Sequence, residues 1–183
     1  MLDHTPEQGE LFSQPGIGSD DSVGYRGPTA CSAAGITYRQ LDYWARTELV
    51  VPSVRSAAGS GSQRLYSFKD ILVLKVVKRL LDTGVSLQNI RLAVDALRER
   101  GVEDLARITL LSDGTTVYEC TSSEEVVDLL RGGQGVFGIA VSGALRELAG
   151  SLATLPSERT DGAVSTEAAD ELARRRQRRT ASA

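Results

Sequence analysis

Two short helical segments separated by a glycine constrain the fold of this chain more than any other feature. Pro28 begins a run of small residues that ends at Gly35, which is typical of a short first helix. Two residues later, Thr37 and Gln40 have the spacing of a capping box, so a second helix is predicted over 38–47. A connection this short predicts a helix–turn–helix.

The segment after the second helix predicts a hairpin and two longer helices. Short β-prone ends flank a centre rich in Ser, Ala and Gly within 53–66, which is typical of a hairpin. Ser67 is the expected N-cap of a third helix that stops before Gly84. Ser86 caps a fourth helix that runs to Gly101. Both helices carry apolar side chains at helical spacing, so each has one face to bury.

Residues 102–156 predict a small α+β unit. Two β-prone runs, 108–111 and 115–120, are separated by a Ser-Asp-Gly turn, and a third strand is expected at 136–141. Helices are predicted from Ser122 to Leu130 and from Ser142 to Leu152. The predicted fold class is therefore mainly α, a winged helix–turn–helix of four helices plus a wing hairpin, followed by a small α+β domain.

The formal net charge of −3 averages segments of opposite sign. Residues 1–24 carry −5, residues 25–100 carry +6, residues 101–156 carry −5 and residues 157–183 carry +1. The first and last segments lack apolar periodicity, so we predict a disordered acidic arm over 1–24 and a disordered Arg-rich tail over 157–183. Between them we predict a DNA-binding domain over 25–101 and a dimerisation or effector domain over 102–156. The excess of positive charge in residues 25–100 favours nucleic acid as the partner of that segment.

Several other function classes lack the residues they need. Cys31 and Cys120 have no clustered partners, so we expect structural roles for both and no metal site. The sole histidine, His4, lies in the arm, which leaves no nucleophile–base set and predicts neither an enzyme nor a cofactor. The glycines of 132–138 lack the Lys-Ser/Thr of a phosphate loop and indicate a turn. With no long apolar run and no signal segment, we expect no membrane partner and a cytoplasmic location.

The second helix and the hairpin carry side chains that suit contact with DNA. Arg and Gln can bind base edges with two hydrogen bonds, while Tyr and Arg can bind phosphate. On spacing alone, a solvated helix face beside a flexible loop is an equal alternative. The side chains in question are Tyr38, Arg39, Gln40, Tyr43 and Arg46 on the helix, and Arg55, Ser62, Gln63 and Arg64 in the hairpin.

Three ordered blocks resemble the winged helix–turn–helix domain of the MerR family. They are AGITYRQLDYWART at 34–47, RLYSFKDI at 64–71 and GVSLQNIR at 84–91. The whole chain is also similar to an actinobacterial, FtsR-like subgroup of these regulators, which implies regulation of cell-division genes.

The resemblance implies a homodimeric transcription regulator. Its second helix is expected in the major groove and its wing on the flanking backbone, so that two protomers read an inverted repeat in double-stranded promoter DNA. RNA polymerase is a further implied partner. By position, Tyr38, Arg39 and Gln40 match base-facing residues, Tyr43 matches a phosphate contact, and Arg64 and Tyr66 match the wing. The full predicted DNA-binding set is Thr37, Tyr38, Arg39, Gln40, Tyr43, Arg46, Arg55, Ser62, Gln63, Arg64 and Tyr66.

The chain departs from the family pattern at two positions of this domain. Asp42 stands where an arginine is usual, which predicts the loss of a backbone contact. Glu48 stands where glycine usually ends the second helix in a left-handed conformation, which predicts strain of about 1 kcal/mol.

Beyond the fourth helix, 102–156 replaces the family's usual long dimerising helix. A protein-interaction adaptor and a small-molecule sensor acting through this region stay open as alternatives. The arginines of 174–179 fit equally a phosphate grip, a solvated end, or a helix paired with Glu167, Asp170 and Glu171.

Overall fold

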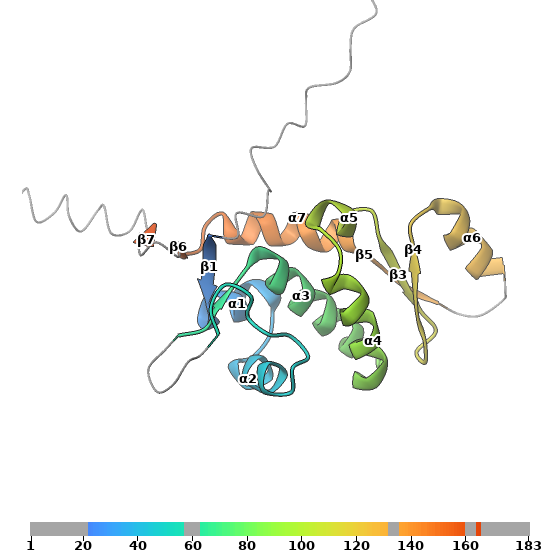
Figure 1. Ribbon diagram of the computed structural model, residues 1–183. Coiled ribbons are helices and arrows are strands. Elements are labelled where there is room, and N and C mark those ends of the chain that lie inside the picture. The colour runs from blue at the N-terminus through green and yellow to red at the C-terminus, as the bar shows by residue number, and fades with distance from the viewer. Residues whose placement is uncertain (1–21, 57–62, 132–135, 160–163, 166–183) are drawn as a thin grey trace, which may run out of the picture.

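The computed structural model describes residues 22–56, 63–131, 136–159 and 164–165 (Figure 1). Its helices are α1 (Gly27–Ala34), α2 (Tyr38–Arg46), α3 (Phe68–Asp82), α4 (Leu87–Arg98), α5 (Val102–Leu105), α6 (Ser123–Arg131) and α7 (Val141–Leu152). Its strands are β1 (Val23–Arg26), β2 (Leu65–Tyr66), β3 (Thr109–Ser112), β4 (Val117–Cys120), β5 (Phe137–Ala140), β6 (Ser157–Arg159) and β7 (Val164–Ser165). No helix in these ranges is long and apolar enough to cross a membrane.

The predicted helix starts are confirmed by their hydrogen bonds. At α2, the Thr37 hydroxyl accepts from the Gln40 backbone N–H at 3.2 Å, and Gln40 Oε1 accepts from the Thr37 N–H at 2.9 Å. At α3, Ser67 and Asp70 form the same reciprocal pair. Ser86 Oγ accepts from a backbone N–H at the start of α4. Local sequence therefore sets where these three helices begin.

The end of α2 has a left-handed residue that is not glycine. The α1 and α3 helices end at Gly35 and Gly84, with φ of 73° and 88°. Glu48 occupies the same place after α2 with φ of 57°, and no other non-glycine residue in the described ranges has a positive φ. The Leu49 N–H donates to the Trp44 carbonyl at 2.9 Å, which closes a Schellman motif. The predicted left-handed conformation of Glu48 is confirmed.

The α3 helix lies at the centre of the fold. It contacts α1 and α4, while α7 packs against both α1 and α3. Figure 1 shows α7 along one side of α1 and α3, and α2 on the other side. Leu145, Leu148 and Leu152 of α7 are buried in the same core as Leu41 and Trp44 of α2. The core therefore continues across the boundary that the sequence predicts at 101–102.

Polar side chains also join α7 to α3. Glu147 Oε1 lies 2.7 Å from Arg79 Nη2, and its Oε2 lies 3.3 Å from Lys75 Nζ. These cations hold the pKa of Glu147 below its usual value, chiefly through the Arg79 hydrogen bond.

The described residues form two antiparallel sheets, and the sequence predicts only one of them. The sheet β4-β3-β5 confirms the three predicted strands of 102–156. The sheet β2-β1-β6-β7 places Val23 opposite Arg159 and Gly24 opposite Glu158. The predictions of disorder for 23–24 and 157–159 were wrong, because each short strand gains its hydrogen bonds from a partner at the far end of the sequence.

Candidate nucleic-acid interface

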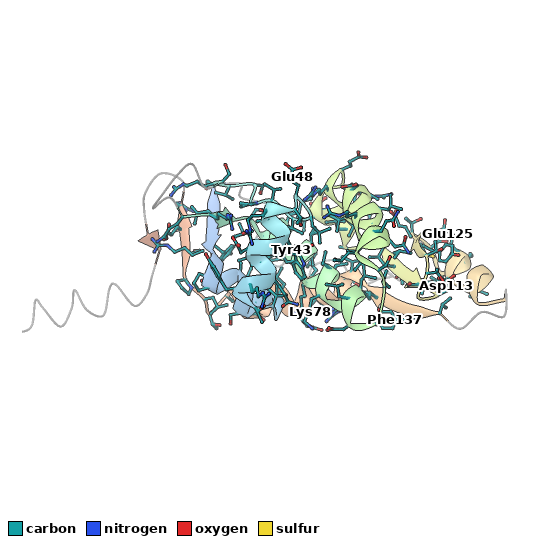
Figure 2. All side chains as sticks on the ribbon, turned by 90° about the horizontal axis from the view of Figure 1, so that it is seen from below. Tyr43, Glu48, Lys78, Asp113, Glu125 and Phe137 are labelled. Atoms are coloured by element: carbon teal, nitrogen blue, oxygen red, sulfur yellow. The ribbon has the colours of Figure 1, made fainter. Side chains whose placement is uncertain are left out.

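One side of α2 faces solvent and the other is packed into the core. Leu41 and Trp44 are both 2% exposed, whereas Tyr38 and Tyr43 are 63% and 48% exposed. Arg39 and Arg46 are exposed on the same side as the two tyrosines. Figure 2 views the molecule from the α2 side and shows Tyr43 on the near surface of that helix. We call Tyr38, Arg39, Tyr43 and Arg46 the α2 face.

Asp42 lies among these residues and pairs with two arginines. Arg64 Nη1 donates to Asp42 Oδ1 at 2.9 Å, and Arg46 Nε lies 3.0 Å from Asp42 Oδ2. The hydrogen bond from Arg64, aided by the charge of Arg46, lowers the pKa of Asp42 below its ordinary value. The acidic residue therefore links α2 to the segment that precedes β2.

The base of the predicted hairpin is present. The backbone of Arg55 exchanges two hydrogen bonds with Leu65, at 3.1 and 2.9 Å. Arg55 and Gln63 are exposed, and Arg64 is partly buried beside Asp42. Ser62 lies outside the described residues. The structure thus brings Arg64 close to α2 and leaves Arg55 and Gln63 at the surface nearby.

Two predicted DNA-binding side chains have other roles in the structure. Tyr66 is 0% exposed, because β2 pairs with β1 and the tyrosine ring packs into the core. The sequence predicts this side chain at the DNA-binding surface instead. Burial raises the pKa of Tyr66 to about 12, against a smaller opposing effect of Arg64. Gln40 is half-buried, and its Oε1 is occupied by the capping box with Thr37. Its amide oxygen is therefore committed to the helix start.

Many basic side chains of 25–100 serve the fold itself. Arg91 donates to the Thr47 carbonyl at 2.9 Å, and Arg98 donates to the Leu49 carbonyl at 2.6 Å, which holds the end of α2. Lys69 donates to the Arg98 carbonyl at 2.6 Å. The net charge of residues 25–100 therefore overstates the number of cationic side chains that are free on the α2 surface.

The comparisons with known proteins agree with this geometry. The sequence profile of the MerR HTH family regulatory proteins matches residues 25–97, which span α1 to α4. Proteins named HTH-type transcriptional regulators, from Mycobacterium bovis and two strains of Mycobacterium tuberculosis, are 76% identical to this chain over 172 residues. The match covers 91% of this chain and 76% of each relative. This chain belongs to the MerR family. It is a transcriptional regulator with a MerR-type DNA-binding domain, and its mycobacterial relatives fit the predicted actinobacterial origin.

The cysteines of this MerR-family chain stand apart from each other. Cys31 is partly buried in α1 and Cys120 is buried in β4, and burial raises the pKa of both thiols. No group of three or more His, Cys, Asp or Glu side chains in the described ranges has the geometry to hold a metal ion. The two thiols lie where apolar packing holds them in the protonated state.

Proposed function

We propose that this MerR-family regulator binds an inverted repeat in promoter DNA as a homodimer, with α2 in the major groove and the hairpin on the flanking backbone. The observation that carries the proposal is the α2 face. Two exposed tyrosines and two exposed arginines lie on one side of a helix whose opposite side is buried. A helix held in this way presents its side chains to base edges with little freedom to turn.

Arg39 is the residue we assign to base reading. It is exposed on α2 and forms no ion pair with any residue in the described ranges. Its guanidinium is therefore available for two hydrogen bonds to a guanine edge, whereas Arg46 already pairs with Asp42. The exposed ring of Tyr43 lies on the same side and suits a phosphate.

We assign the regulatory role to the second half of the chain. Residues 101–156 carry −5, so phosphate repels them and favours an orientation away from the duplex. Figure 1 shows the sheet β4-β3-β5 and α6 at the end of the molecule away from α2 and β1. We assign dimer contacts, contact with RNA polymerase, or receipt of a signal to this region. Regulation, without enzymatic activity, would then take place in the cytoplasm, and the FtsR-like role in cell division stays a prediction.

An adaptor that binds protein instead of DNA is the second candidate, and Asp42 is the observation that favours it. A carboxylate within the α2 face opposes the approach of phosphate. Its charge is compensated by Arg46 and Arg64, which is why DNA binding is the first proposal.

An electrophoretic shift assay with Arg39→Ala tests the first proposal. The probes are a promoter fragment that contains an inverted repeat and the same fragment with the repeat scrambled. The parent should prefer the repeat, and Arg39→Ala should reduce that preference by about 5- to 100-fold, as expected for a lost two-bond base contact. Arg146→Ala, an exposed arginine of α7, is the matched control and should retain the preference. Equal discrimination by Arg39→Ala and the parent would refute the role of α2.

A further inference from the structure

The strand β5 is an outer strand of the sheet β4-β3-β5, and its free edge is unprotected. Among the described residues it pairs with β3 on one side and with no strand on the other. Sheets usually block such an edge with a charged side chain, a proline or a covering helix, because its unpaired backbone groups can bind another strand. Residues 136–145, which contain β5, include neither a charged residue nor a proline. The edge is therefore able to accept a further strand.

The opposite edge of the same sheet is protected. In β4, Glu119 Oε1 lies 2.5 Å from Arg100 Nη2, so a charged pair lies on this strand. The α6 helix also packs against β4. Because both edges belong to one small sheet, the difference between them identifies β5 as the edge open to a partner.

The unpaired backbone groups of β5 belong to Gly138 and Ala140. The Val141 N–H donates to the Ile108 carbonyl at 3.0 Å, and β5 continues antiparallel to β3 from this point. Because hydrogen-bonded pairs alternate along an antiparallel ladder, Ile139 bonds to β3, whereas the backbone groups of its two neighbours point away from β3. Gly138 and Ala140 are both exposed. The free edge therefore offers the N–H and C=O of Gly138 and the N–H of Ala140.

This edge is complementary to a second copy of itself. If two β5 strands pair antiparallel about Gly138, the N–H of each glycine meets the carbonyl of the other. The same register places Phe137 of each copy opposite Ile139 of the other. Phe137 is 40% exposed and Ile139 is 3% exposed (Figure 2). Aromatic and β-branched side chains are a favourable pair across neighbouring strands.

Charge also favours a second copy at this edge. Residues 101–156 carry −5, so two copies of this region repel each other over most of their surface. The uncharged residues 136–145 are the part of it that can meet its own copy without that repulsion. A contact of a surface with itself has a two-fold axis, which is the symmetry of an inverted repeat.

We propose that this chain dimerises through β5, whose free edge pairs antiparallel with β5 of a second copy about Gly138. The three-stranded sheet then continues from one protomer into the other. The inference rests on the proposed function, because it names the contact of the homodimer proposed above. It gives residues 102–156 the dimerising role that a long helix has in many members of the family.

Ala140→Pro tests the inference, because it removes an outward N–H at little cost to the protomer. Ala140 has a φ of −73°, which proline adopts, and Ile139 before it lies in a strand, as suits the residue before a proline. Sedimentation equilibrium of the full chain without DNA measures the Kd of the dimer. We expect a dimeric parent and an increase in Kd of at least about tenfold in the variant, since each protomer loses a hydrogen bond and places a ring at the contact. Ala140→Ser keeps the N–H and should associate as the parent does.

Phe137→Glu is a second variant that leaves the backbone unchanged. It places one negative charge from each copy beside the two-fold axis, so we expect Kd to rise by at least about tenfold. Val127→Glu makes the same charge change at a residue of α6 that is 44% exposed, and it should leave Kd close to that of the parent. Thermal midpoints close to that of the parent show that the variants are folded. If Ala140→Pro is unfolded, Phe137→Glu decides.

The outcomes separate this inference from the proposed function. If Ala140→Pro and Phe137→Glu are folded and as dimeric as the parent, the inference fails and the proposed function stands. A parent that is monomeric at every concentration also overturns the inference, and leaves the edge to a strand of another protein.

A second arm uses DNA. The parent should bind the inverted-repeat fragment more tightly than a single half-site, and Ala140→Pro should lose this advantage while it keeps the half-site affinity of the parent. If the parent dimerises through β5 but binds DNA without sequence preference, the proposed function fails and the inference stands.

Discussion

Arg64 donates a hydrogen bond of 2.9 Å to Asp42, and this pair joins the base of the hairpin to the middle of α2. Asp42 stands where the MerR family usually has an arginine. In this chain the reversed charge pairs with Arg64 and Arg46. The carboxylate therefore aligns two neighbouring cations, Arg46 and Arg64.

Asp42→Asn should strengthen binding to DNA of any sequence. The substitution removes a negative charge from the α2 surface and releases Arg46 and Arg64 to bind phosphate. We expect nonspecific affinity to rise several-fold and the salt dependence to steepen by about one phosphate contact. Fluorescence anisotropy on scrambled duplex over a range of salt concentrations measures both. Glu103→Gln, which makes the same charge change on α5, should have little effect. Weaker binding by Asp42→Asn would show that alignment matters more than charge.

The same carboxylate should contribute to acid sensitivity. Its pKa in the folded protein lies below the ordinary value of 3.8, so its ionised form stabilises the folded state. That contribution is complete above the ordinary value and is lost as pH falls through the lowered one. The stability difference between the parent and Asp42→Asn should therefore narrow below about pH 4. Urea unfolding at a series of pH values measures it. A difference that stays constant down to about pH 2.5 would contradict the pairing.

Glu48→Gly should stabilise the protein. Glu48 has a φ of 57°, which costs a residue with a side chain about 1 kcal/mol and suits glycine. We expect the free energy of unfolding to rise by up to about 1 kcal/mol, measured by urea denaturation. Glu48→Ala is the matched control, because it removes the charge but keeps the Cβ. If alanine stabilises as much as glycine, charge and not backbone strain is the cause.

Leu148→Ala should destabilise the DNA-binding domain, although Leu148 lies on a helix outside that domain. Leu148 of α7 is 0% exposed in the core it shares with α1 and α3. We expect a loss of about 2–5 kcal/mol. The single tryptophan, Trp44, lies on α2, so its fluorescence during urea unfolding reports on that helix. Leu92→Ala, at a residue 70% exposed on α4, should change stability little. An unchanged Trp44 transition in Leu148→Ala would mean that the two parts unfold independently.

The sequence predicts features whose cause is local. The capping box at Thr37 and the N-cap at Ser67 depend on residues only three positions apart, and both are confirmed. Gly35 and Gly84 end helices because their φ values suit glycine. The strands of 102–156 follow from β-prone runs around a turn. In each case neighbouring residues determine the conformation.

Features that depend on pairing between strands far apart in the sequence could not be predicted from it. The β1 and β6 strands are short and pair with each other across most of the length of the sequence, and nothing near Val23 indicates Arg159. The burial of Tyr66 has the same origin, since its strand is paired with β1. The four-residue helix α5 has only one turn, which is too short to show an apolar period. A resemblance to a family shows which residues occupy the family's functional positions, but the pairing of strands determines which of those side chains are exposed.

Selection of bound sequences from a random pool of duplex DNA by the full chain shows directly whether α2 reads a DNA sequence. We expect enrichment of an inverted repeat whose half-sites lie about 10 base pairs, or a multiple of that, apart. Selection with Arg39→Ala should lose the preference at one position in each half-site and keep it elsewhere. A selected pool with no shared sequence would contradict DNA reading by α2.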